Sequence, residues 1–517
     1  MIDQITLTHT RDGLRFDWYS VLEADFINNF ADILTKEIAM TQGKQGITWD
    51  QQKERHLTQL QIAKHLLSAL YQSYTSINSR FERMPVSVPR DANLFSCGAT
   101  KKPKIPYSYR YLSNVINSMI NLGWVEFYRG KEGSGYSRLY ASGILEQAFK
   151  SIGLCWFKQT PNPKESLIVL RDRVIKDNPP FCRGKSKKKY SRITLETPDT
   201  PETQKMAENL YRYNEFLTKH CIAFDLPDNA LHTIAKAMAG NKDQYKPKYL
   251  DLSRTQLRRV FSRGDMTLHG RFYGGWWQSI PSKDFQYRTH ITIDGHRTCE
   301  IDYSAVCLRI LYAFKGISRD PEEDLYDIGL TDWQGRSDPR RDLIKEYINA
   351  IMNDEDETFR LKKHKLKSLG LTHYSLHSLV LKRHHSISEA LNAGIGLKTQ
   401  YVDSKIAEDI MVTMMDLGIL VLPIHDSFIV IDKYKWILHE VMLESFRKIT
   451  GHNGSVDITL SRLPEYFGYS KEDYRQVPEH LKQGPSSSKE DSMMNVYLRS
   501  RSEEHTSELQ SPDHLVC

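Results

Sequence analysis

The chain has 517 residues, which is long enough for roughly two to four domains, each with its own core. Its 71 lysines and arginines outnumber its 64 aspartates and glutamates, so the net charge is +7 and the pI is about 8.8, which suits a polyanionic partner without requiring one. No apolar run is long enough to span a bilayer, and the N-terminus lacks the apolar segment of a signal peptide, so we expect no membrane partner. The seven cysteines are scattered and form no CxxC pair, which favours a reducing, cytoplasmic location and argues against a zinc site.

After a first segment without a recognisable motif, the chain predicts two helices followed by two strands. Between residues 49 and 74, leucines and isoleucines recur at helical spacing. A second helix is predicted at residues 108–122, because Ser108 can cap its start and a glycine follows its end. Residues 124–128 and 136–140 then favour two strands around a glycine-rich turn.

This order of helix, Gly-Trp and basic hairpin resembles the winged helix-turn-helix of plasmid replication initiators and many regulators. Such a module places its second helix in the DNA major groove and its wing along the backbone. A winged helix can also serve only for packing or protein contacts, so both uses remain open. The resemblance implies DNA contacts by six residues of the helix and hairpin: Tyr109, Arg110, Asn114, Arg129, Lys131 and Arg138.

The middle of the chain predicts a linker and then helices. Residues 151–201 are rich in proline and contain a basic run at 183–189, which is either solvated or able to hold a nucleic-acid strand. Helical patterns follow at residues 202–218 and 229–239. Four arginines that recur mostly four residues apart predict a further helix with a basic face: Arg254, Arg258, Arg259 and Arg263.

Two aspartates are predicted to lie at strand ends. Residues 289–293 and 297–301 are β-rich and flank Asp294-Gly295, which suits a type I′ hairpin turn, so the second strand would end on Asp302. Two apolar runs further on flank His425-Asp426 in the same way. Either aspartate alone could be a turn residue. Together, two carboxylates that meet across one sheet could hold two Mg²⁺ ions for an in-line phosphoryl displacement.

The surroundings of these aspartates resemble the family A DNA polymerases. The stretch EIDYSAVCLRIL around Asp302 is similar to motif A of that family, and PIHDSFIV around Asp426 is similar to motif C. The His-Asp-Ser form of the latter looks most like the single-subunit phage and mitochondrial RNA polymerases. Residues 270–288 resemble the segment that touches primer and template, and residues 338–345 resemble motif B. The blocks occur in the family's order and cover residues 254–431.

The resemblance implies an α+β multidomain fold, with an N-terminal winged helix followed by a right-hand polymerase core that has an antiparallel palm sheet and a helical thumb and fingers. The expected boundaries are an unassigned segment at 1–45, the winged helix at 46–150, the linker at 151–201, the polymerase domain at 202–480 and a disordered tail at 481–517. Residues 501–517 of this tail resemble the translation of a sequencing adapter.

The resemblance also assigns roles to individual residues. Asp302 and Asp426 would be catalytic and would bind two Mg²⁺ ions, with Mn²⁺ as an alternative. Arg341 and Lys345 would be catalytic and bind the triphosphate of the incoming nucleotide. Tyr303 and Cys307 would lie beside that nucleotide. Four further residues would contact primer or template: Arg271, Gln278, Arg288 and His425. The neighbouring Trp276 and Trp277 could stack on a base, although buried tryptophans are more common.

Three positions depart from the family pattern. The glutamate that excludes a ribose 2′-hydroxyl in the DNA polymerases aligns with Cys307, and two aromatic positions of motif B are Asn349 and Asn353. Sugar selection must therefore work differently or be relaxed.

These observations predict a DNA-directed DNA polymerase without proofreading, from a phage or mobile element of bacterial origin, with a DNA primer and template and dNTPs as partners. An RNA polymerase or primase that uses NTPs is the alternative enzyme. A winged-helix replication initiator or regulator with an inactive palm is the alternative from another class.

Overall fold

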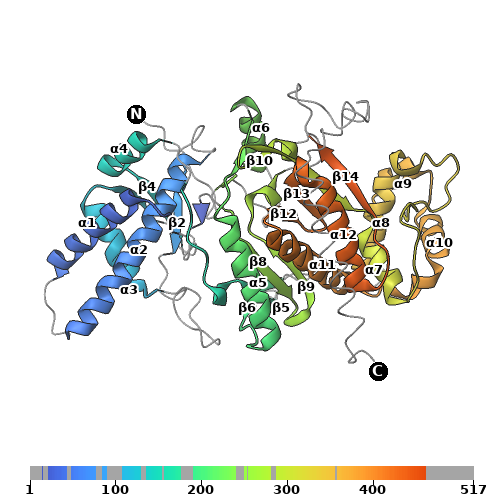
Figure 1. The fold of residues 1–517 in the computed structure, drawn as a ribbon, viewed down its shortest axis with the longest axis horizontal. Helices are drawn as coiled ribbons and strands as arrows, with labels where there is room; N and C mark the ends of the chain where they lie inside the picture. Colours follow the sequence, from blue (N-terminus) through green and yellow to red (C-terminus); the bar gives the residue numbers. More distant parts are fainter. Residues whose placement is uncertain are drawn as a thin grey trace, which may run out of the picture. The chain divides into compact units, whose positions relative to one another are not determined.

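The structure is a computed structural model that describes residues 14–15, 21–42, 48–76, 84–89, 107–129, 136–153, 157–175, 190–226, 228–239, 250–252, 254–280, 287–354 and 358–461. Lys131, the basic run at 183–189 and the tail predicted at 481–517 lie outside these residues. The chain forms two compact units, each assembled from separated stretches (Figure 1). The first comprises residues 1–167, 196–258 and 274–281, and the second comprises residues 168–195, 259–273 and 282–517.

The first unit mixes helices with short strands. Its elements are β1 (Leu14–Arg15), α1 (Asp25–Gln42), α2 (Trp49–Thr75), β2 (Val86–Pro89), α3 (Tyr109–Asn121), β3 (Val125–Tyr128), β4 (Tyr136–Ala141), α4 (Gly143–Ile152), η3 (Lys164–Ser166), α5 (Pro201–Leu217), β7 (Ile222–Phe224), α6 (Asp228–Ala239) and η4 (Trp276–Ser279).

The helices and strands predicted for residues 49–140 are present in this unit. Ser108 caps α3, with its side chain accepting a hydrogen bond from the Arg110 backbone N–H. Gly123 follows the helix with a φ of 66°, a conformation that costs glycine little. β2, β4 and β3 are neighbours in one sheet, and both pairings are antiparallel. Leucine, isoleucine and aromatic side chains of α1, α2, α3 and α4 share one core with these strands. The winged-helix assignment of this arrangement stays a prediction.

Two helices of the first unit match those predicted at residues 202–218 and 229–239. α5 begins with a capping box, in which the Thr200 and Thr203 side chains each bond to the other residue's backbone N–H. Trp276 and Trp277 are both buried, as expected for core aromatics.

The second unit contains the two predicted hairpins. Its elements are β5 (Ile168–Ile175), β6 (Tyr190–Leu195), β8 (Arg258–Ser262), β9 (Asp265–Tyr273), η5 (Tyr287–His290), β10 (Ile291–Ile293), β11 (His296–Tyr303), α7 (Val306–Phe314), η6 (Gly335–Ser337), α8 (Arg341–Met352), α9 (Lys363–Leu369), α10 (His373–Arg383), η7 (His385–Ala390), α11 (Gly396–Asp416), β12 (Val421–Ile424), β13 (Ser427–Ile431), η8 (Asp432–Tyr434), α12 (Lys435–Thr450) and β14 (Val456–Ser461).

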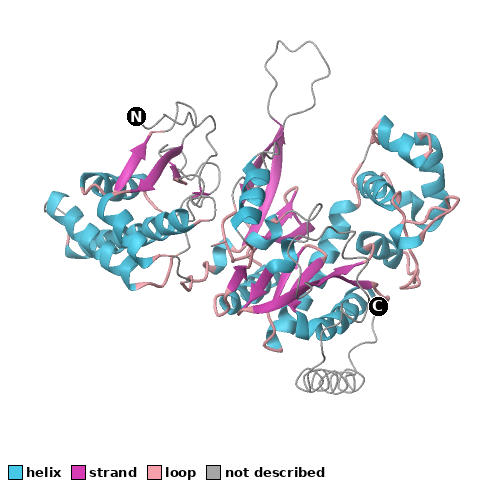
Figure 2. Ribbon diagram, turned by 90° about the horizontal axis from the view of Figure 1, so that it is seen from above, coloured by secondary structure: helices cyan, strands magenta, loops and turns pink. Residues whose placement is uncertain are grey.

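An antiparallel sheet holds both hairpins. β11 pairs with β10, β13 and β14, and β13 pairs with β12. Asp294 and Gly295 have φ values of 52° and 76°, as a type I′ turn requires, and His425 has a φ of 61° at the other turn. α11 and α12 pack against this sheet (Figure 2).

A second sheet, in the order β6-β5-β8-β9, differs from the sequence prediction in two places. The prediction of a helix with an arginine face is wrong, because Arg258–Ser262 is strand β8. Its Val-Phe content and the following Arg263-Gly264 turn, with φ values of 58° and 66°, favour a hairpin more strongly than the arginine spacing favours a helix. Residues 151–201, predicted as a linker, contribute β5 and β6 to the same sheet.

The chain between β11 and β12 is mostly helical, as predicted. Apolar side chains of α7, α8 and α10 form a core together with residues 325–328 and 387–391. The molecule is therefore a multidomain protein of mixed α and β structure. Within the part of the chain that the structure describes, every helix is too short or too polar to cross a membrane.

Arg259 on β8 provides a test of how this unit is held together. Its side chain is 1% exposed, donates to the Gly270 carbonyl at 2.9 Å and to Ser404 Oγ at 3.1 Å, and pairs with Glu408 on α11. Arg259→Ala leaves these acceptors unpaired, so we expect a loss of about 3–5 kcal/mol in the free energy of unfolding, measured by urea denaturation.

Lys448→Ala is the matched control, since Lys448 pairs with the adjacent α11 residue, Asp409, but is 54% exposed. It should cost at most about 1 kcal/mol. Equal losses in the two variants would show that the burial of Arg259 does not matter.

Candidate active site

Asp302 and Asp426 lie at the same end of the antiparallel sheet. Asp302 is opposite Ser427 in the β11–β13 register, directly after Asp426. The Tyr303 backbone N–H donates to the Asp426 carbonyl at 3.2 Å, which fixes the two segments together. On the other side of β11, Asp302 is opposite Asp457 of β14. The two predicted carboxylates, 124 positions apart in the sequence, are therefore neighbours in space.

The environment of Asp302 disfavours its ionised form. Burial raises the pKa of Asp302 well above its usual range, and the negative charge of Asp426 raises it further. The positive charge of Lys345 opposes this rise. Asp302 Oδ1 is buried, and none of the described residues donates a hydrogen bond to it. An oxygen in this state is suited to a cation or a proton.

The two carboxylates fit a hard divalent cation that is also coordinated by oxygens of a bound substrate. The carboxylates of Asp302 and Asp426 supply oxygen donors of the kind that Mg²⁺ and Mn²⁺ prefer. Among the described residues, no group of three or more His, Cys, Asp or Glu side chains is arranged to enclose a metal. Asp457 pairs with Arg336 instead. A cation here would thus depend on oxygens from a bound substrate as well.

Helix α8 carries the two predicted triphosphate ligands on one face. Arg341 Nε donates to both carboxylate oxygens of Asp324, at 3.2 and 3.0 Å, and its guanidinium lies 4.9 Å from the centre of the Tyr326 ring. Lys345 is exposed one turn later, where its charge acts on Asp302. Spacing of four residues places both cations on the same side of the helix.

The structure separates Tyr303 from Cys307. Tyr303 points into the core, where it donates to the Met442 carbonyl and packs on Phe446. Cys307, on α7, is half-buried. Burial raises its pKa to about 12, Asp403 and Asp426 raise it as well, and Arg271 opposes them. Of these two residues, only Cys307 has a pKa that is affected by the charge of Asp426.

Arg271 is held by an ion pair between β9 and α11. Its Nε donates to Asp403 Oδ2 at 2.8 Å, and Asp403 is fully buried. Burial raises the pKa of Asp403 to about 6, although the Arg271 charge lowers it. Gly270 makes this contact possible, because a Cβ there would lie 2.8 Å from Ser404 Oγ and 2.9 Å from the Phe261 ring.

A second set of polar contacts surrounds His425. His269 Nδ1 bonds to Gln400 at 2.6 Å, and its Nε2 bonds to the Tyr273 hydroxyl at 2.9 Å. The Tyr273 ring meets His425 edge-on at 5.3 Å. Burial lowers the pKa of His425 to about 4, the nearby Arg271 lowers it further, and Asp426 opposes this change. The His425 ring is therefore neutral at physiological pH and brings no positive charge to the site.

Arg288 is fixed beneath the turn that carries Asp426. Its Nη1 donates to Glu300 Oε1 at 2.8 Å, and the Ser427 hydroxyl donates to the same oxygen at 2.8 Å. Arg271, Arg288 and His425 thus all belong to the surroundings of Asp426. Gln278 lies in the first unit, where it accepts from the Gly274 backbone N–H at 3.1 Å.

The residues predicted to contact DNA also lie in the first unit. Tyr109, Arg110 and Asn114 are on the first turns of α3, and Arg110 is exposed. Arg129 is exposed just after β3, and Arg138 is half-buried on β4. Lys131 lies outside the described residues. Their use in binding DNA stays a prediction.

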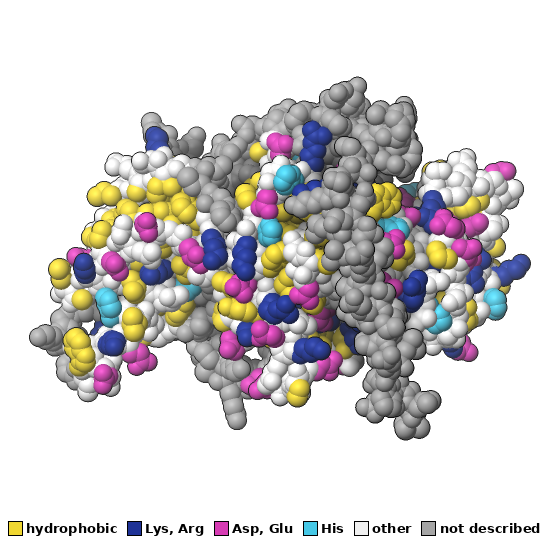
Figure 3. All heavy atoms as spheres, in the orientation of Figure 1, with side chains coloured by type: hydrophobic (Ala, Val, Ile, Leu, Met, Phe, Trp, Pro, Cys, Tyr) yellow, Lys and Arg dark blue, Asp and Glu magenta, His cyan; other side chains and the backbone are white. Residues whose placement is uncertain are grey.

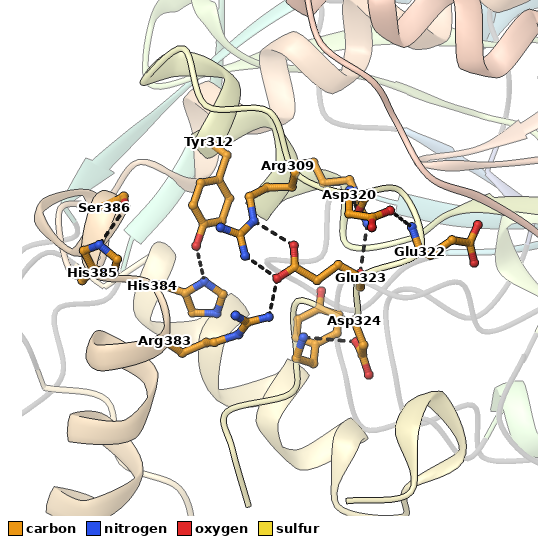
Figure 4. A network of polar contacts seen from close by, with 12 residues as sticks. Arg309, Tyr312, Asp320, Glu322, Glu323, Asp324, Arg383, His384, His385 and Ser386 are labelled. Carbon is orange, nitrogen blue, oxygen red and sulfur yellow. Dashed lines mark hydrogen bonds and ion pairs between the residues drawn. The ribbon is translucent and has the colours of Figure 1, made fainter.

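Arg309 anchors the helical region to the strand end. Its guanidinium donates to the carbonyls of Ser304, Asp320, Pro321 and Glu323, at 3.0 to 3.1 Å. The Glu323 carboxylate in turn pairs with Arg319 and with Arg383 (Figure 4). Arg309 is therefore a structural link between Asp302 and the chain leading to α8.

His384, in the same network, is buried and bonds to the Tyr312 hydroxyl at 2.9 Å. Burial lowers its pKa to about 4. It therefore fills a hydrogen-bonding role in the core.

Several residues of this site were not predicted from the sequence. Asp457, Asp324, Glu300 and Tyr273 lie outside the recognised blocks or occupy positions without a family role. Only the β-rich stretch VDITLS around Asp457 offers a sequence signal, since it predicts one more strand that could end beside the others. The pairing of Arg341 with Asp324 could not be predicted, because it depends on the path of residues 315–340, whose sequence shows neither helical nor strand periodicity.

Comparisons with known proteins give weak similarity to solved structures. No family model matches the chain, and no curated protein matches it. Among solved structures, it is similar to the POL domain of Pol1 from M. smegmatis in complex with DNA primer-template and dNTP, with 11% sequence identity and a TM-score of 0.28. The similarity covers 50% of this chain and 51% of that chain. A likeness of this size establishes neither the fold nor the activity.

The raised pKa of Cys307 predicts an unreactive thiol. At pH 8 we expect iodoacetamide to label Cys307 at least about a thousandfold more slowly than a free thiol, whose pKa is about 8.5, because only the thiolate reacts. The rate should rise roughly tenfold per pH unit. Tandem mass spectrometry distinguishes Cys307 from Cys299.

Asp403→Asn removes one of the negative charges that raise this pKa. It should therefore speed labelling at a fixed pH. Labelling of the unmodified chain as fast as a free thiol would contradict the buried environment.

Proposed function

We propose that this chain catalyses template-directed nucleotidyl transfer, extending a primer on a DNA template as a divergent DNA polymerase of family A type. The observation that supports this most directly is the pair of Asp302 and Asp426 at adjoining strand ends. Asp302 Oδ1 is buried and receives no hydrogen bond from the residues that the structure describes, and the charge of Lys345 on α8 acts on Asp302. Replication of a phage or mobile element is the proposed setting.

The two aspartates would hold divalent cations, Mg²⁺ or Mn²⁺. When bound, these lower the pKa of the attacking 3′-hydroxyl and stabilise the charge of the triphosphate. Lys345 binds the phosphates from the exposed face of α8 and neutralises the leaving pyrophosphate. Arg341 is oriented by Asp324 and Tyr326, so that its direction is set before the nucleotide arrives.

The contacts of Arg271, Arg288 and His425 support a role at the primer end. Each is fixed by buried or half-buried partners around Asp426. Such fixed groups hold the primer terminus at a defined distance from the carboxylates without reorganisation. Gln278 and the α3 and hairpin residues of the first unit would also contact the DNA.

An RNA polymerase or primase is the second candidate, favoured by Cys307. A thiol at this position lacks the length and charge of the family's glutamate, so it does not exclude a ribose 2′-hydroxyl in the same way. The neighbouring Asp403 is fully engaged with Arg271 in this structure.

Primer extension tests the enzyme and its sugar preference together. Purified protein with Mg²⁺ and a primed DNA template should extend the primer with dNTPs, while Asp426→Asn should lower the rate by at least about a hundredfold because a cation ligand is lost. Extension with NTPs, or without a primer, would support the second candidate.

Asp294→Asn is the matched control. Asp294 is at the exposed turn before β11, where asparagine is equally favoured, so this variant should keep full activity. If the protein incorporates no nucleotide in any reaction but binds duplex DNA tightly, the enzyme hypothesis is wrong and the replication-initiator alternative is supported.

Cation binding is testable without activity. Mg²⁺ at about ten times its dissociation constant should stabilise the protein by about 1.4 kcal/mol, seen as a higher Tm than in EDTA. Asp302→Asn should abolish this shift. It should also raise the Tm in EDTA, because it removes a buried carboxylate that is repelled by Asp426. An equal Mg²⁺ shift in both proteins would place the cation elsewhere.

A further inference from the structure

A pocket of about 170 Å³ lies among α8, α10 and the segment before α9. Aromatic and imidazole rings form most of its lining, together with one arginine: Tyr347, Phe359, Arg360, His373, Tyr374 and His377. All of these residues belong to the second unit.

The rings of this pocket are held in fixed positions. The Tyr347 hydroxyl bonds to His377 Nδ1 at 2.8 Å. His373 and His377 are stacked, with their ring centres 6.1 Å apart and an angle of 17° between the planes. Phe359 lies 6.1 Å from Tyr347 on another side. These contacts make a wall that presents flat ring faces to a ligand.

Two groups of the pocket are suited to a ligand. Tyr374 is 82% exposed, which is unusual for an aromatic side chain. His373 Nδ1 is buried, and none of the described residues forms a hydrogen bond with it. A planar molecule with polar edges would stack on the Tyr374 ring and form a hydrogen bond with His373 Nδ1.

The segment that follows Phe359 is strongly basic, whereas residues 354–357 just before it are all acidic. Residues 360–385 contain no aspartate or glutamate, five histidines, and seven lysines and arginines: Arg360, Lys362, Lys363, Lys365, Lys367, Lys382 and Arg383. Lys365 pairs with Glu346, and Arg383 pairs with Glu323. The other five cations are exposed. At the right-hand end of Figure 3, where Figure 1 places α10, dark blue and cyan side chains lie among magenta and uncharged ones.

The pocket is distinct from the catalytic face of α8. Tyr347 follows Lys345 by two residues, which is about 200° around a helix. Tyr347 is buried on the pocket side, whereas Lys345 is exposed and acts on Asp302. A ligand in the pocket would therefore contact the opposite side of the helix that carries Arg341 and Lys345.

We propose that this pocket and its basic surroundings bind single-stranded nucleic acid. One base stacks on Tyr374 and the imidazole faces, with a polar edge on His373 Nδ1, while Arg360, Lys362 and Lys363 contact the neighbouring phosphates. Aromatic faces bordered by cations are the common features of proteins that bind single strands. An acidic peptide would match the charge but not the flat rings. A metal is disfavoured, because Tyr347 engages His377 Nδ1 and no third ligand is grouped there among the described residues.

Binding of a fluorescent oligothymidylate to the full chain, followed by anisotropy, tests this proposal. Tyr374→Ala should weaken binding by between about fivefold and about a hundredfold, because it removes one stacked base. The exposed position of Tyr374 leaves the fold unchanged, which the Tm verifies. Replacing Lys362 and Lys363 with glutamine should reduce the slope of log affinity against log salt by about 1.4.

Trp436→Ala is the matched control, since Trp436 is an exposed aromatic next to a lysine on α12. It should bind the oligonucleotide like the unmodified chain. Asp302→Ala should also bind normally, so that a failed polymerase assay and a failed binding assay are distinguishable.

Crosslinking of an oligonucleotide that contains 5-iododeoxyuridine should label the peptide carrying His373 and Tyr374. Unchanged affinity in Tyr374→Ala, or equal weakening of duplex and single-strand binding, would overturn the proposal. Tyr374-dependent binding of dTMP as tight as that of the oligonucleotide would identify a free nucleotide as the ligand, which also overturns it.

Discussion

The repulsion between two carboxylates at adjoining strand ends is the constraint on which the rest of the second unit depends. Antiparallel pairing of β11 with β13 brings Asp302 and Asp426 together, and their partial burial limits how far water screens them. The electrostatic cost of this arrangement falls on Asp302, whose pKa is raised by burial and by Asp426. Lys345 on α8 reduces this cost, and Arg271 on β9 attracts Asp426. Arg271 and Arg288 each pair with a buried acid, so the site consists of alternating charges.

This alternation explains why polar residues occupy otherwise apolar interfaces. Strands β8 and β9 are joined to α11 by three contacts that occur at successive turns of the helix: His269–Gln400 and Arg271–Asp403 from β9, and Arg259–Glu408 from β8. Breaking either ion pair leaves a buried charge, so these contacts hold the two strands at one register on the helix. Arg309 has a similar role, because its hydrogen bonds connect the end of β11 to residues 320–323. Rigid support of this kind is what a site needs to hold reacting groups in place.

The sequence predicted the elements that depend on local chemistry. Asp294-Gly295 and the apolar runs around His425-Asp426 were enough for both hairpins, and Ser108 was enough for the start of α3. It failed where pairing partners are distant. β8 was mistaken for a helix, because the spacing of arginines says nothing of the strand β5 beside it. Asp457 was missed for the same reason, since its proximity to Asp302 depends on how β14 pairs with β11.

The position of Asp403 changes how Cys307 should be understood. From the sequence, replacement of a glutamate by cysteine removes a negative charge beside the nucleotide. In the structure, Asp403 is close enough to raise the pKa of Cys307, so a carboxylate is present in the same environment but originates from another helix. Its ion pair with Arg271 neutralises much of the charge and fixes its place, whereas a glutamate on α7 would extend freely from its own helix. The identity of residue 307 alone therefore does not determine the charge in this region, and the geometry of α11 against β9 contributes as much.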